Sequence, residues 1–166
     1  MPSFKQPSVI GAVFQNSKIL LVKRRDVPVW VLPGGGVDKE EGLEEALRRE
    51  IWEESGFHVK VLRKVGEYFP INRLANYTHL FECTLISGEA TLSQETREVE
   101  FFDIDNLPSL PPPYLDWIQD CLKQEKEIIQ KYLTGINYTI LLKYLFLHPI
   151  LVFRFLLARL GRPINR

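Results

Sequence analysis

The sequence predicts a mixed α+β domain over residues 1–110, followed by a helical C-terminal extension. Short β-branched and aliphatic runs alternate with turn-forming residues, and one segment between them has helical periodicity. The composition also changes along the chain. All 21 acidic residues lie in residues 1–127, whereas residues 128–166 contain six basic residues, no acid and mostly apolar side chains. The acidic body and the basic, apolar extension therefore need separate explanations.

Six strands are expected in the body. The runs 8–14 and 18–23 are separated by the turn-forming residues Gln15, Asn16 and Ser17, which predicts a β-hairpin. A short strand is expected at 29–32, just before three consecutive glycines. The further strands are expected at 58–65, 78–86 and 99–102.

Two helices are expected beside these strands. Leu43, Leu47 and Ile51 repeat every four residues, and Gly56 follows as a helix terminator. After a proline-rich loop, a second amphipathic helix is expected within residues 111–134 and ends before Gly135. Its apolar face would consist of Leu115, Ile118, Leu122, Ile129 and Leu133.

Composition excludes several kinds of site. Cys83 and Cys121 are the only cysteines and match no zinc-binding or redox spacing, which argues against a cysteine nucleophile or structural zinc. This cysteine usage favours a cytoplasmic location, and the N-terminal ten residues lack the pattern of a secretory signal. The net acidity of residues 1–127 argues against sequence-independent nucleic-acid binding.

The residues most indicative of chemistry are three glutamates on the first helix. Glu50, Glu53 and Glu54 have i, i+3 and i+4 spacing and so share one face, just after the glycines Gly34, Gly35 and Gly36. Such carboxylates repel one another, and a hard cation such as Mg²⁺ or Mn²⁺ would offset that repulsion. The alternative is an ordinary solvated helix face.

The stretch 34–57 resembles the signature of the Nudix (MutT-like) hydrolases, G-x5-E-x7-R-E-U-x-E-E-x-G-U, where U is a bulky apolar residue. All nine specified positions are filled: Gly35, Glu41, Arg49, Glu50, Ile51, Glu53, Glu54, Gly56 and Phe57. The preceding Trp30-Val31-Leu32-Pro33-Gly34 is similar to the lead-in usual in that family.

The resemblance implies an α/β/α sandwich with a mixed β-sheet. It also implies Mg²⁺-dependent hydrolysis of a pyrophosphate bond in a nucleoside diphosphate linked to another group. Nucleoside triphosphates, ADP-ribose and dinucleoside polyphosphates all remain open as substrates. The alternative is a catalytically silent nucleotide-binding or membrane-associated scaffold module on the same fold, and the intact set of acids argues against it.

Site residues follow from the resemblance position by position. Glu53 and Glu54 are implied metal ligands, together with Glu50 and the backbone carbonyl of Gly34. Arg49 is implied to orient a glutamate, and Glu50 is one candidate for the general base. The supporting positions are Gly35 and Glu41.

A further acid is implied near the last expected strand, where Glu95 and Glu98 both fit and the sequence does not choose between them. Arg24 and Arg25 follow an expected strand and are candidates for binding substrate phosphates. The alternative is that they form an ordinary basic strand end.

The extension, residues 135–166, lies outside the resemblance. Two helices are expected within it, broken at His148-Pro149 because proline cannot continue a helix. Its longest charge-free runs are too short to span a bilayer, which takes about 20 residues. Two interpretations of residues 136–160 stay open: packing on the body or on a second subunit, and peripheral contact with an anionic membrane. Arg154 and Arg159 interrupt the apolar run.

Overall fold

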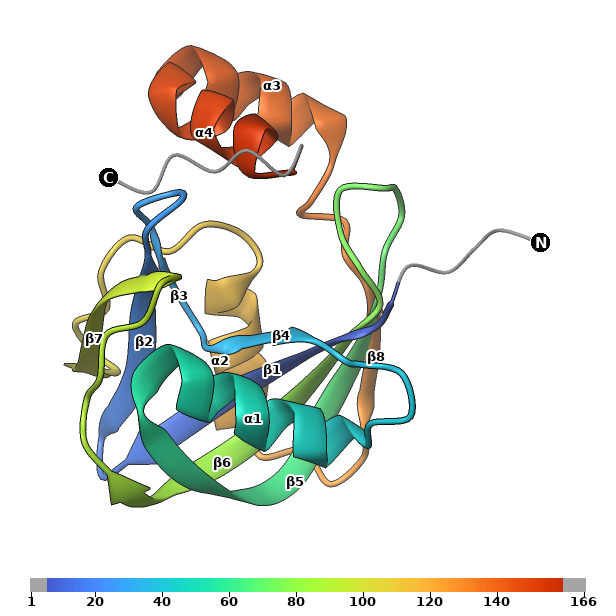
Figure 1. The fold of residues 1–166 in the computed structure, drawn as a ribbon. Helices are drawn as coiled ribbons and strands as arrows, with labels where there is room; N and C mark the ends of the chain where they lie inside the picture. Colours follow the sequence, from blue (N-terminus) through green and yellow to red (C-terminus); the bar gives the residue numbers. More distant parts are fainter. Residues whose placement is uncertain (1–5, 160–166) are drawn as a thin grey trace.

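The computed structural model describes residues 6–159, and side chains up to residue 157. The body is a mixed β-sheet with one helix on each face, as expected (Figure 1). The strands are β1 (Ser8–Gln15), β2 (Lys18–Arg24), β3 (Trp30–Val31), β4 (Gly34–Gly36), β5 (Phe57–Phe69), β6 (Thr78–Gly88), β7 (Thr96–Asp103) and β8 (Ile129–Tyr132). The helices are α1 (Leu43–Ser55), α2 (Tyr114–Leu122), α3 (Tyr138–Leu147) and α4 (Pro149–Arg159).

The strand order along the sheet is β3-β2-β1-β6-β5-β8, with β4 paired to β1 and β7 paired to β2. β1 and β6 are parallel, as are β5 and β8, and the other pairs are antiparallel. The expected hairpin is present: Phe14 pairs with Ile19, and Asn16 adopts a φ of 56° in the turn. Asparagine tolerates this conformation better than most residues.

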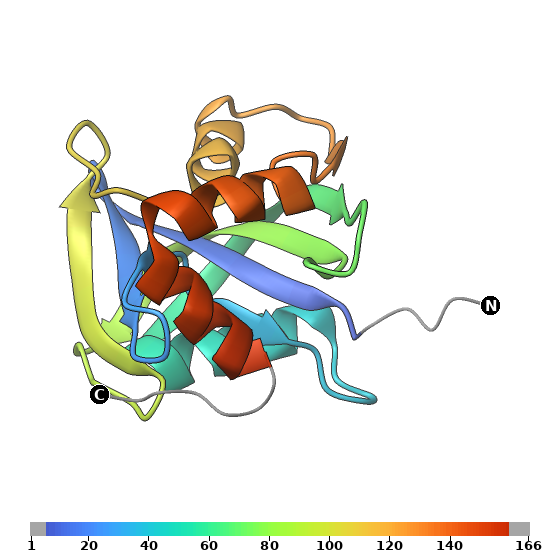
Figure 2. The same cartoon turned by 90° about the horizontal axis from the view of Figure 1, so that it is seen from above.

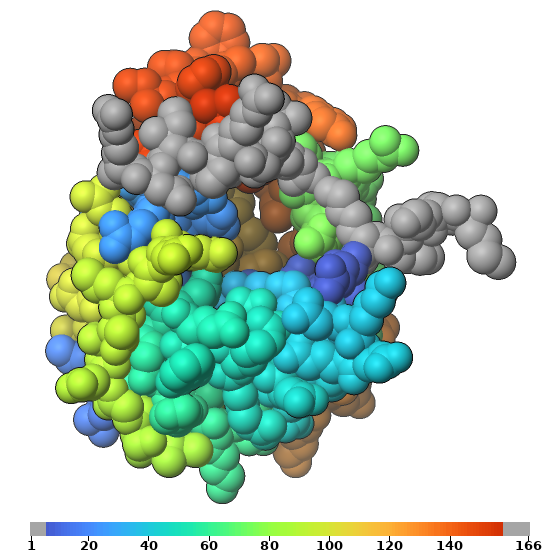
Figure 3. Space-filling model, viewed as in Figure 1, coloured from blue at the N-terminus to red at the C-terminus, as the bar shows by residue number. Residues whose placement is uncertain are grey.

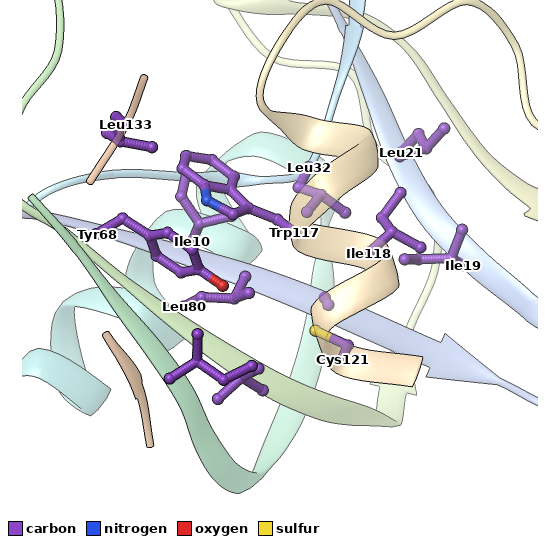
Figure 4. Close-up of a cluster of buried hydrophobic side chains, with 13 residues drawn as sticks. Ile10, Ile19, Leu21, Leu32, Tyr68, Leu80, Trp117, Ile118, Cys121 and Leu133 are labelled. Carbon is purple, nitrogen blue, oxygen red and sulfur yellow. The ribbon is translucent and has the colours of Figure 1, made fainter. Parts of the chain in front are cut away.

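Two apolar clusters hold the helices against the sheet. On one face, Ala46, Leu47 and Ile51 of α1 pack on β1, β2, β5 and β6. On the other face, Trp117 and Ile118 of α2 pack among residues of β1, β2, β5 and β6, as Figure 4 shows. This second cluster also includes Cys121, while Cys83 lies in the first, so both cysteines are buried core residues.

The second helix is shorter than the sequence predicts. The 111–134 prediction is wrong in its second half, because α2 ends at Leu122 and β8 pairs with the edge strand β5. Two apolar residues assigned to the helix, Ile129 and Leu133, are buried from this strand segment instead. The open edge of β5 offers backbone hydrogen-bonding groups, and pairing them is worth more than prolonging an isolated helix.

The glycines before α1 also differ from expectation. Gly34–Gly36 form β4, which pairs with β1 so that Val9 lies opposite Gly35. Periodicity could not identify this strand because glycines have no side chains to alternate.

The extension forms two helices with the break where the sequence placed it, between α3 and α4 at His148-Pro149. Seen from above, these helices lie across the body (Figure 2). In the described part of the chain, no helix is long and apolar enough to cross a membrane. Residues 160–166, with Arg162 and Arg166, and the Arg159 side chain lie outside the described structure.

Candidate active site

An acidic cavity lies between the glycine strand, α1 and the segment that leads into β7. Its lining consists of Arg24, Asp26, Gly34, Gly35, Gly36, Glu50, Glu53, Glu54, Ser93, Gln94 and Glu95. The three glutamates of α1 therefore face one cavity, as their helical spacing predicts. Most other residues implied by the family signature lie on this cavity or contact its walls.

Glycine is required where the strand meets the acids. Gly34 has a φ of 152°, and a Cβ there would overlap the carbonyl oxygen of Val9. A Cβ on Gly35 would overlap the carboxyl group of Glu50. The missing side chains let α1 approach β4, and the backbone N–H of Gly34 donates a hydrogen bond to Glu54 Oε2 at 2.9 Å.

Arg49 binds the acids on the near side of the cavity. Its guanidinium donates hydrogen bonds to both carboxylate oxygens of Glu41, at 2.8 and 2.9 Å, and to Glu50 Oε1 at 2.9 Å. A longer contact of 3.4 Å reaches Glu53 Oε2. The hydrogen bonds from Arg49 lower the pKa of Glu41 to about 2, so Glu41 stays ionised and fixes the arginine. This geometry matches the orienting role implied for Arg49.

The cavity is electrostatically unfavourable for its own acids. Burial raises the pKa of Glu54 to about 8, since the hydrogen bond from Gly34 is outweighed by desolvation and by the charges of Glu50 and Glu95. Burial also raises the pKa of Glu50, against the opposing effect of Arg49. A bound cation would reverse both effects, and an all-carboxylate donor set suits Mg²⁺ or Mn²⁺. Among the described residues, no three acids are already gathered as a metal-binding group.

Glu95 and Glu98 have different surroundings in the folded protein. Glu95 lines the cavity and forms no ion pair with the residues that the structure describes. Glu98 is bound by Lys23 at 2.9 Å, with Arg97 at 3.8 Å, and does not line the cavity. Of the two candidate acids, Glu95 therefore lies at the cavity and Glu98 lies outside it, and a catalytic role for either stays a prediction.

The two candidate phosphate-binding arginines also differ in whether they line the acidic cavity. Arg24 lines the acidic cavity and is held by Asp26, with Nε 2.8 Å from Oδ1. Arg25 lies outside that lining and donates to the carbonyl oxygen of Ser93 at 2.9 Å. Successive residues at a strand end point in opposite directions, so only one of the two can face the site.

A second, apolar cavity adjoins the acidic one. It has a volume of about 480 Å³ and shares Arg24 and Gly34–Gly36 with the acidic cavity. Its walls come from β1, β3, α2, the loop 74–78 and the helices of the extension. Figure 3 shows a hollow between these helices and the body.

Sequence reasoning missed Tyr114, which lines this second cavity. Burial raises the pKa of Tyr114 to about 12, with smaller effects from the charges of Arg24, Glu54 and Asp26. Its phenol therefore lies within electrostatic reach of Arg24 and Glu54, although it does not line the acidic cavity. Only its place after three prolines marked it in the sequence, and that pattern signals a loop rather than a site.

Comparison with known proteins identifies the family. The family model described as NUDIX domain matches residues 5–123. An ADP-ribose pyrophosphatase of Methanocaldococcus jannaschii is 36% identical over 122 residues, which are 70% of this chain and 72% of that protein.

Two solved structures extend the likeness to the fold. The crystal structure of an ADP-ribose pyrophosphatase from Streptococcus suis superposes with a TM-score of 0.64 and 28% identity, over 76% of this chain and 98% of that one. The crystal structure of a UDP-X diphosphatase superposes with a TM-score of 0.68 and 26% identity, over 79% of this chain and 68% of that one. The family match, the filled signature and the similarity to solved pyrophosphatases lead to one conclusion: this chain belongs to the Nudix family and is a hydrolase of pyrophosphate bonds.

Proposed function

We propose that this protein is a Mg²⁺-dependent pyrophosphohydrolase of a nucleotide-derived substrate such as a nucleoside triphosphate, ADP-ribose or a dinucleoside polyphosphate. The observation that carries the proposal is the position of Glu54 beside Glu50 and Glu53, facing one cavity at the glycine strand. A carboxylate that burial keeps partly protonated is a poor surface group but a good ligand for a cation that neutralises it.

The charged residues of the cavity have different proposed roles. Glu50, Glu53 and Glu54 would hold the cation together with the Gly34 carbonyl. The cation, when bound, supplies charge neutralisation of the diphosphate and a Lewis acid beside the reacting phosphorus. Arg24 contributes a positive charge to the cavity lining, where it would orient the diphosphate. Arg49 and Glu41 keep Glu50 in place through their hydrogen bonds.

The test is a panel of nucleotides incubated with and without Mg²⁺ and analysed for pyrophosphate, phosphate and nucleoside monophosphate. We expect Mg²⁺-dependent turnover of at least one nucleotide, with Mn²⁺ substituting. Turnover that persists in excess chelator, or its complete absence across the panel at millimolar Mg²⁺, would contradict the proposal.

We also propose that Glu95 accepts the proton of the attacking water. Replacement by glutamine should lower kcat by about 10²–10⁴-fold, the range typical of a lost general base, while KM changes little. Glu98→Gln is the matched control, because Glu98 pairs with Lys23 outside the cavity, and its kcat should stay within about twofold of wild type. Equal losses in the two variants would refute the assignment.

A second proposal concerns peripheral contact with an anionic membrane through the outer surface of the extension. This outer apolar face consists of Leu142, Leu145, Phe146, Leu147, Ile150, Phe153 and Leu156, all of them exposed. Phe146 is 83% exposed and Ile150 is 74% exposed, whereas free surfaces seldom collect such residues in one patch. The absence of acidic residues after Glu127 complements a negatively charged lipid surface.

Cosedimentation with vesicles containing phosphatidylglycerol tests this contact. The full chain should bind anionic vesicles more strongly than phosphatidylcholine vesicles, and Phe146→Ser/Ile150→Ser should reduce that binding at least tenfold. Leu92→Ser, on an exposed apolar residue of the body, is the control. Equal sedimentation of the wild type and the double variant would sink the membrane proposal, as would a wild type that forms dimers through this face without binding vesicles.

A further inference from the structure

We propose that α3 and α4 form a lid that completes the binding cavity for the aromatic base of the substrate, and that Arg154 holds this lid closed. The inference rests on the proposed function, since it assigns the uncharged part of the substrate to the apolar cavity beside the acidic one. The family model ends at residue 123, so the lid lies outside the region that defines the family.

The lid contributes side chains to the cavity wall from both helices. Ile140, Leu141 and Tyr144 come from α3 at i, i+1 and i+4 spacing, so they lie on one face of that helix. Leu151, Val152 and Phe155 repeat the same spacing on α4. Val152 is only 5% exposed. The opposite wall is the body itself, from β1, β3 and α2.

This arrangement accounts for the apolar inner face of the extension. A helix without a polar face needs apolar surroundings on every side. The inner face of the lid supplies one wall of the cavity, and the outer apolar face is left exposed. A helical pair that only packed on the body would need no cavity beneath it.

Arg154 connects the lid to the loop after β2. Its Nε donates to the carbonyl oxygen of Asp26 at 2.6 Å, and its Nη2 donates to the carbonyl oxygen of Arg25 at 2.7 Å. The side chains of Asp26 and the neighbouring Arg24 line the acidic cavity. The same few residues therefore hold the lid and form the wall where the diphosphate is expected. A second contact, from Asn72 Nδ2 to the carbonyl of Ile136 at 2.7 Å, fixes the segment that leads into α3.

The lining favours a planar heterocycle over a hydrocarbon chain. Tyr114, Trp117 and Tyr144 provide aromatic surface, and aromatic rings stack favourably on bases. Thr78 and Asn76 add polar groups to the same walls. The buried indole nitrogen of Trp117 has no hydrogen-bond partner among residues 6–157, and a base offers acceptor atoms that a hydrocarbon lacks. The volume of about 480 Å³ lies within the range of small-molecule sites.

Equilibrium binding to the full-length protein tests the lid without requiring turnover. The probes are the α,β-methylene analogues of ADP and UDP, measured by calorimetry in the presence of Mg²⁺. Phe155→Ala removes part of the inner wall and Arg154→Ala removes the latch. Each should raise Kd by about tenfold, because Phe155→Ala loses apolar contact surface and Arg154→Ala loses the two hydrogen bonds that hold the lid. Phe153→Ala, on the outer face of the same helix and 57% exposed, is the matched control and should bind like wild type.

A kinetic comparison separates the lid from a general loss of structure. On the best substrate of the nucleotide panel, Arg154→Ala and Phe155→Ala should raise KM by a similar factor and leave kcat within about twofold, with Mn²⁺ binding to the acids unchanged. Wild-type Kd values in both variants would overturn the lid, and so would an equal loss in Phe153→Ala. A wild type that binds the analogues but hydrolyses no nucleotide would overturn the proposed function and leave the lid supported.

Discussion

Replacing Glu53 with glutamine should reduce kcat by about 10³-fold, because one negative charge is lost from the proposed cation site. Such a loss corresponds to about 4 kcal/mol of transition-state stabilisation, within the several kcal/mol that a bound metal supplies. The Glu53 side chain is 49% exposed, and within the described part of the chain its only ion pair is a 3.4 Å contact with Arg49, so the fold should tolerate the change. Steady-state kinetics over a range of Mg²⁺ concentrations, with thermal unfolding as a structural check, measures the effect.

The matched control for this prediction is Glu45→Gln. Glu45 is exposed on the same helix, two turns before Glu53, and does not line the acidic cavity. It should retain wild-type kcat. If Glu53→Gln turns over at the wild-type rate in saturating Mg²⁺, the assignment of Glu53 as a metal ligand is refuted.

The second large effect is expected at Asp120, which stabilises the fold rather than the site. Its carboxylate is 2% exposed and accepts hydrogen bonds from the Tyr68 hydroxyl at 2.9 Å and from the ammonium groups of Lys123 and Lys131 at 2.7 Å. Asp120→Ala would leave the buried Tyr68 hydroxyl without a partner and would free both lysines. We expect a loss of about 3 kcal/mol in the free energy of unfolding, near the low end for a broken buried pair because both lysines are about half exposed.

Chemical denaturation at different pH values checks the cause. Burial of Asp120 opposes its ionisation, but the hydrogen bonds from Lys123, Lys131 and Tyr68 outweigh burial and lower its pKa below the usual 3.8. A lowered carboxyl pKa in the folded state stabilises the protein above the unfolded pKa, and this stabilisation is lost as the pH falls through the folded pKa. The free energy of unfolding of the wild type should therefore exceed that of Asp120→Asn at pH 7, and this excess should be smaller at pH 3.

Gln119→Ala, at an exposed position of the same helix, serves as the control and should change stability by less than about 0.5 kcal/mol. The contrary result is that the wild type and Asp120→Asn differ in free energy of unfolding by the same amount at pH 7 and at pH 3. That result would show that the charge of Asp120 is not what stabilises the fold.

Local sequence patterns determined several features of the fold and of the candidate site. Glu50, Glu53 and Glu54 lie on one helix face because helical spacing alone places them there. The break at His148-Pro149 follows from the chemistry of proline, and the hairpin at Asn16 follows from turn-forming residues. None of these features depends on a distant part of the chain.

Other features depended on which segments meet in space. Glu95 and Glu98 are three residues apart and chemically equal, and only the pairing of β7 with β2 brings Glu98 to Lys23 and leaves Glu95 at the cavity. Ile129 fits the spacing of a helix but joins a sheet, because an open strand edge was available.

The extension also combines features set by local sequence with features set by tertiary contacts. Its sequence determined two apolar helices, since their composition and the proline are local properties. Only the tertiary structure decided that one face closes the cavity beside the acids while the other is exposed, because both faces are equally apolar and the sequence contains nothing that distinguishes them. A contact such as that of Arg154 with the carbonyl oxygen of Asp26, across 128 positions of the chain, follows from no local pattern.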